Sequence, residues 1–235
     1  MRTLVIIPTY NEKDNIFFVL QKIILLYHEA IDVLVVDDNS PDGTAEQVAT
    51  LQHSYSSIFL LKRVGKIGLA SAYIDGFTYA IEHDYDVVIQ MDADLSHDPL
   101  YIKNFLEQIT HHDVVVGSRY MKGGGVKAWS LFRRVLSFLG NFYAQIILGM
   151  STRDLTGGYN CWRMNTLKNM GLRNIRSQGY SFQIELKYKA HISNASLFEI
   201  PIIFSDRTSG KSKFSKYIFF EAMWRVWWMR LFIGR

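Results

Sequence analysis

The fold of this 235-residue chain is decided by residues 86–99, Asp-Val-Val-Ile-Gln-Met-Asp-Ala-Asp-Leu-Ser-His-Asp-Pro. The apolar run 87–91 predicts a buried strand, and Pro99 suits the first turn of a following helix. Two carboxylates, Asp92 and Asp94, follow the strand, at the sheet edge where open α/β folds bind ligands. Carboxylate oxygens suit Mg²⁺ or Mn²⁺ shared with substrate phosphates. A solvated acidic turn is the alternative interpretation.

Apolar strands and helical patterns alternate on both sides of this stretch. The predicted strands are 4–7, 33–36, 58–61, 114–116 and 199–204, and the predicted helices are 15–27, 44–53, 68–83 and 99–110. This alternation indicates βαβ units, and therefore an α/β fold with a mostly parallel sheet flanked by helices. Gly123-Gly124-Gly125 predicts a flexible loop in the less regular second half.

Composition excludes several classes of protein. Hydrophobic residues make up 49% of the chain, which is inconsistent with a disordered protein. The single cysteine, Cys161, excludes an intramolecular disulfide and favours packing over chemistry. The net charge of +4 comes without a continuous basic stripe, so we expect no nucleic-acid partner. The N-terminal apolar run stops at Pro8 and no apolar run reaches 18 residues, so we expect neither a secretory signal nor a membrane-spanning helix.

Polar residues also follow the first two predicted strands, at the same sheet edge as the acid pair. The segment 8–12 contains Tyr10, which can stack on a planar ring, and Glu12, which can accept hydrogen bonds. Asp38 follows the second strand and can bind a base or a ribose. Neither a Gly-x-Gly-x-x-Gly sequence after the first strand nor a Walker lysine loop is present, which argues against dinucleotide oxidoreductases and P-loop enzymes. Turn and cap roles are the alternative.

Further motifs follow the acid pair in a fixed order. The whole series is Pro8-Thr9-Tyr10-Asn11-Glu12, residues 36–44 (Val-Asp-Asp-Asn-Ser-Pro-Asp-Gly-Thr), Lys66-x-Gly68-Leu69 with Tyr73, residues 91–99, Gly117-Ser118-Arg119-Tyr120, Asp154-Leu155-Thr156-Gly157-Gly158, Gly179-Tyr180-x-Phe182-Gln183, and Asp206-Arg207-x-x-x-Gly210-x-Ser212-Lys213. Over residues 3–216 the chain therefore resembles the dolichyl-phosphate (polyprenol-phosphate) mannosyltransferases, which are inverting nucleotide-sugar transferases of GT-A fold.

The resemblance implies a role for individual residues. The guanosine of GDP-mannose would be held by Pro8, Tyr10, Glu12, Val36 and Asp38. The ribose, the diphosphate and a divalent metal, Mg²⁺ or Mn²⁺, would be met by Asp92, Ala93 and Asp94, with Ser96 where some relatives place a glutamine ligand. Phosphates of the donor would be neutralised by Arg119, Arg207 and Lys213. The lipid phosphate would be bound by Arg119, Arg133 and Ser137, and the catalytic residues would be Asp94 and Arg119.

The implied reaction transfers mannose from GDP-mannose to dolichyl or polyprenyl phosphate with inversion. A phosphate monoester is mostly ionised at neutral pH, so this acceptor needs cations to position it rather than a strong general base. One alternative keeps the fold but uses UDP-glucose or another UDP-sugar, and another is a non-catalytic partner subunit. Gln183 and Glu185 are candidate sugar-side residues.

Two apolar segments point to a membrane surface. Residues 135–150 and 218–233 carry apolar and aromatic side chains with basic neighbours, which favours helices lying in the bilayer interface. We therefore expect a catalytic domain, 1–216, followed by an amphipathic helix, 217–235, in a peripheral enzyme. Its expected location is the cytoplasmic face of the endoplasmic reticulum in a eukaryote or of the plasma membrane in a prokaryote. A small membrane-anchoring subunit is a possible partner, and core or subunit-contact helices are the alternative.

Overall fold

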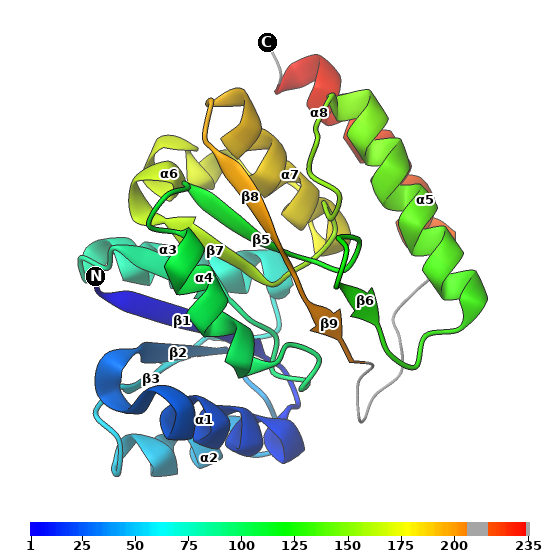
Figure 1. The fold of residues 1–235 in the computed structure, drawn as a ribbon. Coiled ribbons are helices and arrows are strands. Elements are labelled where there is room, and N and C mark those ends of the chain that lie inside the picture. The colour runs from blue at the N-terminus through cyan, green and yellow to red at the C-terminus, as the bar shows by residue number, and fades with distance from the viewer. Residues whose placement is uncertain (206–215, 234–235) are drawn as a thin grey trace.

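The central feature of the fold is one mixed sheet. The structure, a computed structural model, describes residues 1–205 and 216–233, and within them seven strands are ordered β3-β2-β1-β4-β7-β5-β8 (Figure 1). These strands are β1 (Thr3–Thr9), β2 (Asp32–Asp37), β3 (Ile58–Lys62), β4 (Val87–Gln90), β5 (Val114–Ser118), β7 (Asn160–Arg163) and β8 (Leu197–Pro201). Every neighbouring pair is parallel except those of β7, which runs antiparallel to β4 and β5. The predicted mostly parallel α/β sheet is confirmed.

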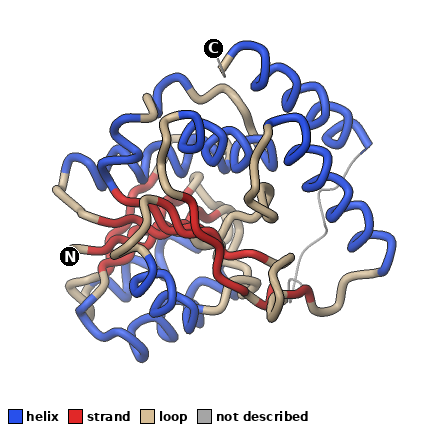
Figure 2. The backbone as a smooth tube through the Cα atoms, turned by 45° about the horizontal axis from the view of Figure 1, so that its top comes forward, coloured by secondary structure: helices blue, strands red, loops and turns tan. Residues whose placement is uncertain are grey.

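Helices cover both faces of this sheet (Figure 2). One face is covered by α1 (Lys13–Tyr27), α2 (Thr44–Gln52) and α4 (Ile102–Gln108), and the other by α3 (Leu69–Glu82), α6 (Met164–Asn169) and α7 (Gly179–Ile192). In β1, Val5 and Ile7 enter the first core, whereas Leu4 and Ile6 enter the second. A strand buried on both faces requires a continuous apolar run, which is why 4–7 contains no polar residue.

Two helices form a layer outside the sheet. α5 (Leu131–Leu148) and α8 (Lys216–Phe232) lie side by side (Figure 1), α8 packs against α7, and all three helices contribute to one hydrophobic core. Their shared core contains Ala144 and Leu148 from α5 and Val226 and Met229 from α8. Among the described helices, none combines the length and the apolarity needed to cross a membrane.

The sequence pattern predicted no strand at β7, and this was wrong. Four residues are too few for a clear period, yet β7 occupies the middle of the sheet between β4 and β5. Cys161 and Trp162 enter opposite cores and are both fully buried. Burial raises the pKa of the Cys161 thiol, which fits the packing role predicted for it.

The single strand predicted at 199–204 is two strands in the structure. β8 ends at Pro201, and β9 (Ile203–Phe204) pairs instead with β6 (Gly125–Val126) in a separate two-stranded sheet. The predicted glycine loop is shorter than expected: Gly123 and Gly124 lie outside any strand, whereas Gly125 begins β6. A Cβ atom on Gly124 would lie 2.5 Å from the Ser118 carbonyl oxygen, so close backbone packing requires a glycine there.

Candidate active site

The carboxyl edge of the parallel strands gathers the predicted donor-side residues. β1, β2 and β4 run in the same direction and end at Thr9, Asp37 and Gln90. Pro8 is paired in register with Val36, so these two predicted residues are neighbours across β1 and β2. Because parallel strands end at one edge, the polar segments that follow them share that edge. The grouping predicted from the sequence is confirmed at this level.

The acid pair is held by hydrogen bonds in a turn directly after β4. Oδ1 of the buried Asp94 accepts hydrogen bonds from the backbone N–H and the hydroxyl of Ser96. Oδ1 of Asp92 accepts the hydroxyl of Tyr73 at 3.2 Å. Burial and the Asp92 charge raise the pKa of Tyr73 well above its ordinary value, so its hydroxyl remains a donor. Asp92, Asp94 and Ser96 therefore present carboxylate and hydroxyl oxygens, the donor type that Mg²⁺ and Mn²⁺ prefer.

His97 completes the turn and was not among the predicted site residues. Its Nδ1 accepts a hydrogen bond from the backbone N–H of Asp92 at 3.0 Å, and its ring stacks on Tyr159 at 4.6 Å between centroids. Burial lowers the pKa of His97 despite the nearby Asp92 and Asp94 charges, which favours the neutral imidazole that this bond requires. The histidine thus orients the acid pair.

A metal at this turn would need ligands beyond the protein. In the part of the chain that the structure describes, no three His, Cys, Asp or Glu side chains are grouped so as to hold a metal ion. Mg²⁺ commonly uses one or two carboxylates together with substrate phosphates and water. The donor set of Asp92, Asp94 and Ser96 fits that arrangement and does not fit a closed, all-protein metal cage.

The predicted base-binding residues are ordered by an arginine that the sequence analysis missed. The Asp38 carboxylate pairs with the buried Arg63 guanidinium and accepts the backbone N–H groups of Ile67 and Gly68 at 3.2 and 2.9 Å. Nζ of Lys66 lies 3.8 Å from the centroid of the Tyr10 ring. Asp38 therefore anchors the loop 63–68 beside Tyr10. The only sequence signal was the Lys66-x-Gly68 motif, which borders Arg63.

Glu12 lies at the start of α1 and is integrated into the same edge. Its carboxylate accepts a hydrogen bond from Nδ2 of Asn15 at 2.9 Å, and its backbone N–H donates to the hydroxyl of Thr44 at 3.1 Å. These bonds connect the start of α1 with the start of α2. A contact of Glu12 or Asp38 with guanosine stays a prediction.

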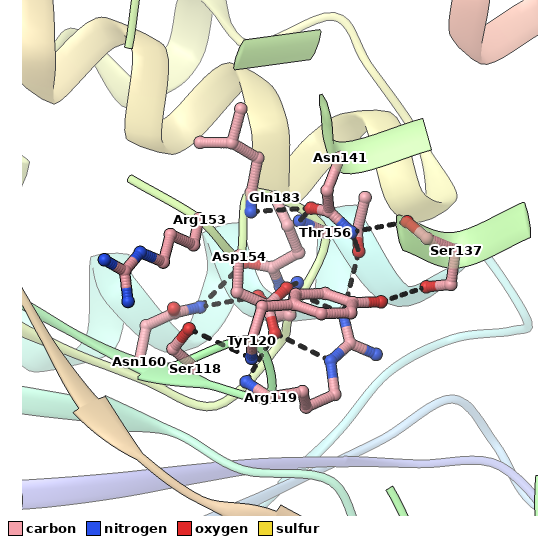
Figure 3. Close-up of polar contacts among 12 residues, drawn as sticks. Ser118, Arg119, Tyr120, Ser137, Asn141, Arg153, Asp154, Thr156, Asn160 and Gln183 are labelled. Carbon is pink, nitrogen blue, oxygen red and sulfur yellow. Dashed lines mark hydrogen bonds and ion pairs between the residues drawn. The ribbon is translucent and has the colours of Figure 1, made fainter. Parts of the chain in front are cut away.

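Arg119, at the end of β5, is held by a buried carboxylate (Figure 3). Its Nε and Nη2 donate to the two oxygens of Asp154, each at 2.7 Å, and its backbone N–H donates to Oδ2 at 3.0 Å. Nη2 also donates to the hydroxyl of Thr156 at 2.8 Å. Burial would raise the pKa of Asp154, but the Arg119 charge and hydrogen bonds hold it below its ordinary value. Asp154 was quoted as part of a motif but was missed as a site residue.

Aromatic rings surround the Arg119 guanidinium and connect it with the other predicted acceptor residues. The Trp129 and Phe204 ring centroids lie 5.6 Å from Cζ of Arg119, and Cζ of Arg133 lies 4.0 Å from that of Trp129. The Tyr120 hydroxyl donates to that of Ser137 at 2.7 Å (Figure 3). The structure thus brings Arg119, Arg133 and Ser137 into one aromatic neighbourhood, and their binding of a lipid phosphate stays a prediction.

A pocket opens at this neighbourhood. Its volume is about 430 Å³, and it is lined by Arg119, Tyr120, Gly125, Val126, Trp129, Arg134, Val135 and Phe138. Its walls are mostly apolar, with two arginines, Arg119 directly after β5 and Arg134 in α5. Arg134 was interpreted from the sequence as a surface residue; it is exposed, but it also lines this pocket. The pocket can receive an anion attached to an apolar chain.

A buried polar network lies between the acid turn and the segment 154–158. The Trp162 indole, which can only donate, binds Oε1 of Gln90 at 2.8 Å, and Nδ2 of Asn160 faces that oxygen, the Gly157 carbonyl and Oε1 of Gln183, each at 3.1 Å. These contacts orient Gln183 so that its buried Nε2 has no hydrogen-bond partner. A Cβ on Gly158 would lie 3.7 Å from that nitrogen and 3.9 Å from Oδ1 of Asp92.

Glu185, the other candidate on the sugar side, has a structural role instead. Its buried carboxylate accepts the backbone N–H groups of Ser177 and Arg176, at 2.9 and 3.4 Å. It therefore fixes the segment before α7. Arg207 and Lys213, predicted to neutralise phosphates, lie outside the described residues.

Apolar side chains are exposed along α5 and α8. In α5 they are Leu131, Phe132, Val135, Phe138, Leu139, Phe142 and Ile146, and in the described part of α8 they are Trp224, Trp227, Leu231 and Phe232. We call this set the apolar surface. Val135 and Phe138 belong both to this surface and to the pocket wall. Exposed apolar patches of this kind are typical of sites that contact a partner or a membrane.

Comparison with known proteins gives consistent relatives. The model of Glycosyl transferase family 2 matches residues 4–171. The chain is 40% identical to undecaprenyl-phosphate mannosyltransferase of Micrococcus luteus, over 96% of this chain and 93% of that protein. It is 39% identical to polyprenol monophosphomannose synthase of Mycolicibacterium smegmatis, over 96% of this chain and 85% of that protein.

Solved structures share the fold at low sequence identity. Glucosyl-3-phosphoglycerate synthase from Mycobacterium tuberculosis, in complex with Mn²⁺, UDP and phosphoglyceric acid, aligns with a TM-score of 0.68 and 16% identity, over 99% of this chain and 78% of that one. Mannosyltransferase PcManGT from Pyrobaculum calidifontis, in complex with GDP-Man and Mn²⁺, aligns with a TM-score of 0.63 and 19% identity, over 90% and 58%. These likenesses establish the GT-A fold expected from the sequence.

Proposed function

The chain belongs to glycosyl transferase family 2 and, within it, to the polyprenyl-phosphate mannosyltransferases, and from this premise we propose that it transfers mannose from GDP-mannose to polyprenyl phosphate. The observation that carries the proposal is the pocket at Arg119, where guanidinium groups meet apolar walls. A lipid phosphate has this combination of an anion and an apolar chain. The names of the two relatives specify the same acceptor class and the same sugar.

The donor would lie along the carboxyl edge of the sheet. Tyr10 and the loop anchored by Asp38 would border the nucleoside, and Asp92 and Asp94, with Ser96, would hold Mg²⁺ or Mn²⁺ at the diphosphate. When bound, this ion would stabilise the charge that develops on the departing nucleoside diphosphate. Solved proteins of this fold are described in complex with Mn²⁺ and a nucleotide or nucleotide sugar, which supports a divalent metal here. Arg207 and Lys213 remain proposed phosphate ligands.

The acceptor phosphate would bind at Arg119. Arg133 and Ser137 do not line the pocket, but they contact its lining residues Trp129 and Tyr120 and remain proposed ligands of the phosphate. A phosphate monoester has a second pKa of about 6, so it reaches the site already ionised and needs no general base. Guanidinium groups suit this task because their planar forks bind two oxyanion oxygens at once. Direct attack of the phosphate on the sugar carbon inverts that carbon and gives a β-linked lipid product. Asp94 and Arg119 therefore serve the leaving group and the nucleophile, respectively.

The apolar surface would place the enzyme at a bilayer. The lipid chain of the acceptor cannot leave the membrane cheaply, so the pocket must open near the membrane surface. Val135 and Phe138 belong to both the pocket and the apolar surface, so the lipid chain of the acceptor would have a continuous apolar path from the pocket to the bilayer. We propose peripheral attachment at the cytoplasmic face, through α5 and the segment 217–235. A small anchoring subunit remains a proposed partner.

Product formation tests this proposal directly. Purified protein is incubated with polyprenyl phosphate, Mg²⁺ or Mn²⁺, and radiolabelled GDP-mannose, UDP-glucose or another UDP-sugar in parallel. We expect labelled lipid with GDP-mannose only, and chelation of the metal should abolish it. If only a UDP-sugar gives labelled lipid, the donor is that sugar and not GDP-mannose. If no nucleotide sugar gives a lipid product with either metal, the proposed activity is wrong.

A further inference from the structure

A fully buried lysine lies beneath the segment that carries the partner of Arg119. Nζ of Lys187, on α7, donates hydrogen bonds to the carbonyl oxygens of Gly157 at 2.7 Å and Leu155 at 3.2 Å. A buried ammonium group is costly, and two carbonyl oxygens only partly replace its water shell. The segment 154–158 is already held by other bonds, for example from the backbone N–H groups of Leu155 and Thr156 to Oδ1 of Asn141. Hydrogen bonding alone therefore does not explain why a charge is placed there.

The charges around Lys187 suggest what it does. Asp154, Arg119 and Glu199 act on it from three other segments of the chain. Asp154 binds Arg119 through both oxygens, so this pair carries no net charge, while Glu199 accepts the backbone N–H groups of Arg153 and Asp154. An arginine neutralised in this way attracts a phosphate weakly unless another cation offsets its carboxylate.

We propose that Lys187 is a positioning residue for the acceptor phosphate: its ammonium fixes the segment 155–157 and offsets the Asp154 charge behind Arg119. The proposal rests on the proposed function, because it concerns the same acceptor site. Lys187 does not touch the substrate; it acts through Asp154 and Arg119.

The proposal has a consequence for pH dependence. Burial lowers the pKa of Lys187 to about 7, although Asp154 favours the charged form. The ammonium is therefore present below neutral pH and is lost as the pH rises. The acceptor phosphate has a second pKa of about 6 and gains negative charge as the pH rises, so its own titration would lower the acceptor KM and cannot produce a rise. The acceptor KM of the natural enzyme should rise between neutral and alkaline pH.

Lys187→Met tests the role, with Lys189→Met as a matched control. Lys189 is a second buried lysine of α7, but it contacts the Met170 carbonyl at 3.5 Å, away from the site. At about pH 6.5, Lys187→Met should raise the acceptor KM by about tenfold or more, the scale of one hydrogen bond to a charged group, and change the donor KM less than about twofold. Lys187→Met should also abolish the rise of the acceptor KM at alkaline pH. Lys189→Met should keep the acceptor KM and the pH dependence of the natural enzyme.

Other outcomes would overturn the proposal. An unchanged acceptor KM and pH profile in Lys187→Met would refute it. Equal increases of the donor KM and the acceptor KM in Lys187→Met, also seen in Lys189→Met, would refute it as well. If Lys187→Met fails to fold by circular dichroism, Lys187→Gln keeps a donor without the charge, and the pH profile of the natural enzyme needs no variant; a flat profile refutes the proposal. Absence of mannose transfer by the natural enzyme at every pH would instead refute the proposed function.

Discussion

Replacing Asp154 by asparagine should destabilise the protein, because it breaks the buried ion pair that holds Arg119. The carboxylate accepts three hydrogen bonds from Arg119 and one from the backbone N–H of Gly157. Both members of the ion pair are buried, with 7% of the Arg119 side chain and 0% of the Asp154 side chain exposed. Breaking such a pair leaves a buried charge uncompensated and costs about 3–5 kcal/mol. We expect Asp154→Asn to lower the free energy of unfolding by that amount.

Activity should fall as well, because Arg119 loses the group that orients it. Displacement of a positioning contact by about 1 Å can reduce turnover about a hundredfold. Denaturant unfolding followed by tryptophan fluorescence gives the stability, and labelled mannose transfer gives the turnover. The control is Asp86→Asn, whose exposed carboxylate lies 3.9 Å from the N-terminal amine at the opposite sheet edge. It should change stability by less than about 1 kcal/mol.

A double variant and the pH dependence complete the test. Arg119→Gln with Asp154→Asn removes both charges, so its loss should be smaller than the sum of the two single losses by about 1.5–3 kcal/mol. The pKa of Asp154 is lowered in the folded protein, so its contribution is present above the ordinary aspartate pKa and is lost as the pH falls through the folded value. Asp154→Asn should lack this acid-dependent loss. Additive single losses, or natural stability in Asp154→Asn, would refute the reasoning.

Three further predictions concern the donor site, its loop and the membrane. Asp94→Asn should reduce mannose transfer by at least about a hundredfold with an unchanged circular dichroism spectrum; full activity would exclude Asp94 from the metal site. Arg63→Gln leaves the buried Asp38 carboxylate without its cation, so the donor KM should rise about tenfold in steady-state assays while the acceptor KM stays constant; equal changes in both would contradict the local role. Phe138→Ser should weaken liposome flotation about tenfold, whereas Phe18→Ser, which changes a similarly exposed side chain of α1, should not. Equal loss of flotation in the two variants would argue against a specific apolar surface.

The sheet edge proposed to bind the donor could be predicted from the sequence because its signals are local. An apolar run ending in Asp92 and Asp94 specifies both a buried strand and the end of that strand where the acids lie. Three such strands in parallel bring their ends together whatever the details of packing. Cys161 was assigned to packing by a similar local argument. The short β7 that contains it was missed, because four residues carry no period and their place in the sheet depends on distant strands.

The acceptor side depended on tertiary structure. The sequence indicated Arg119, Arg133 and Ser137 through resemblance, but it contained no sign that Asp154 binds Arg119, that Arg63 binds Asp38, or that the lysine at 187 is fully buried. Partners of this kind lie 25 to 35 positions apart, and the charge of a side chain does not specify which opposite charge it will meet.

By itself, the sequence determined the fold class, the sheet edge where the proposed donor residues lie, and the family. Only the tertiary structure decided which charges are buried together and which apolar side chains stay exposed. The physical reason is that strand and helix periods are properties of neighbouring residues, whereas burial and ion pairing depend on distant segments packed against each other. The acid pair at 92 and 94 could be proposed as a ligand site from its place after a buried strand and from the resemblance; the buried carboxylate and the aromatic surroundings of the arginine at 119 became visible only in the tertiary structure.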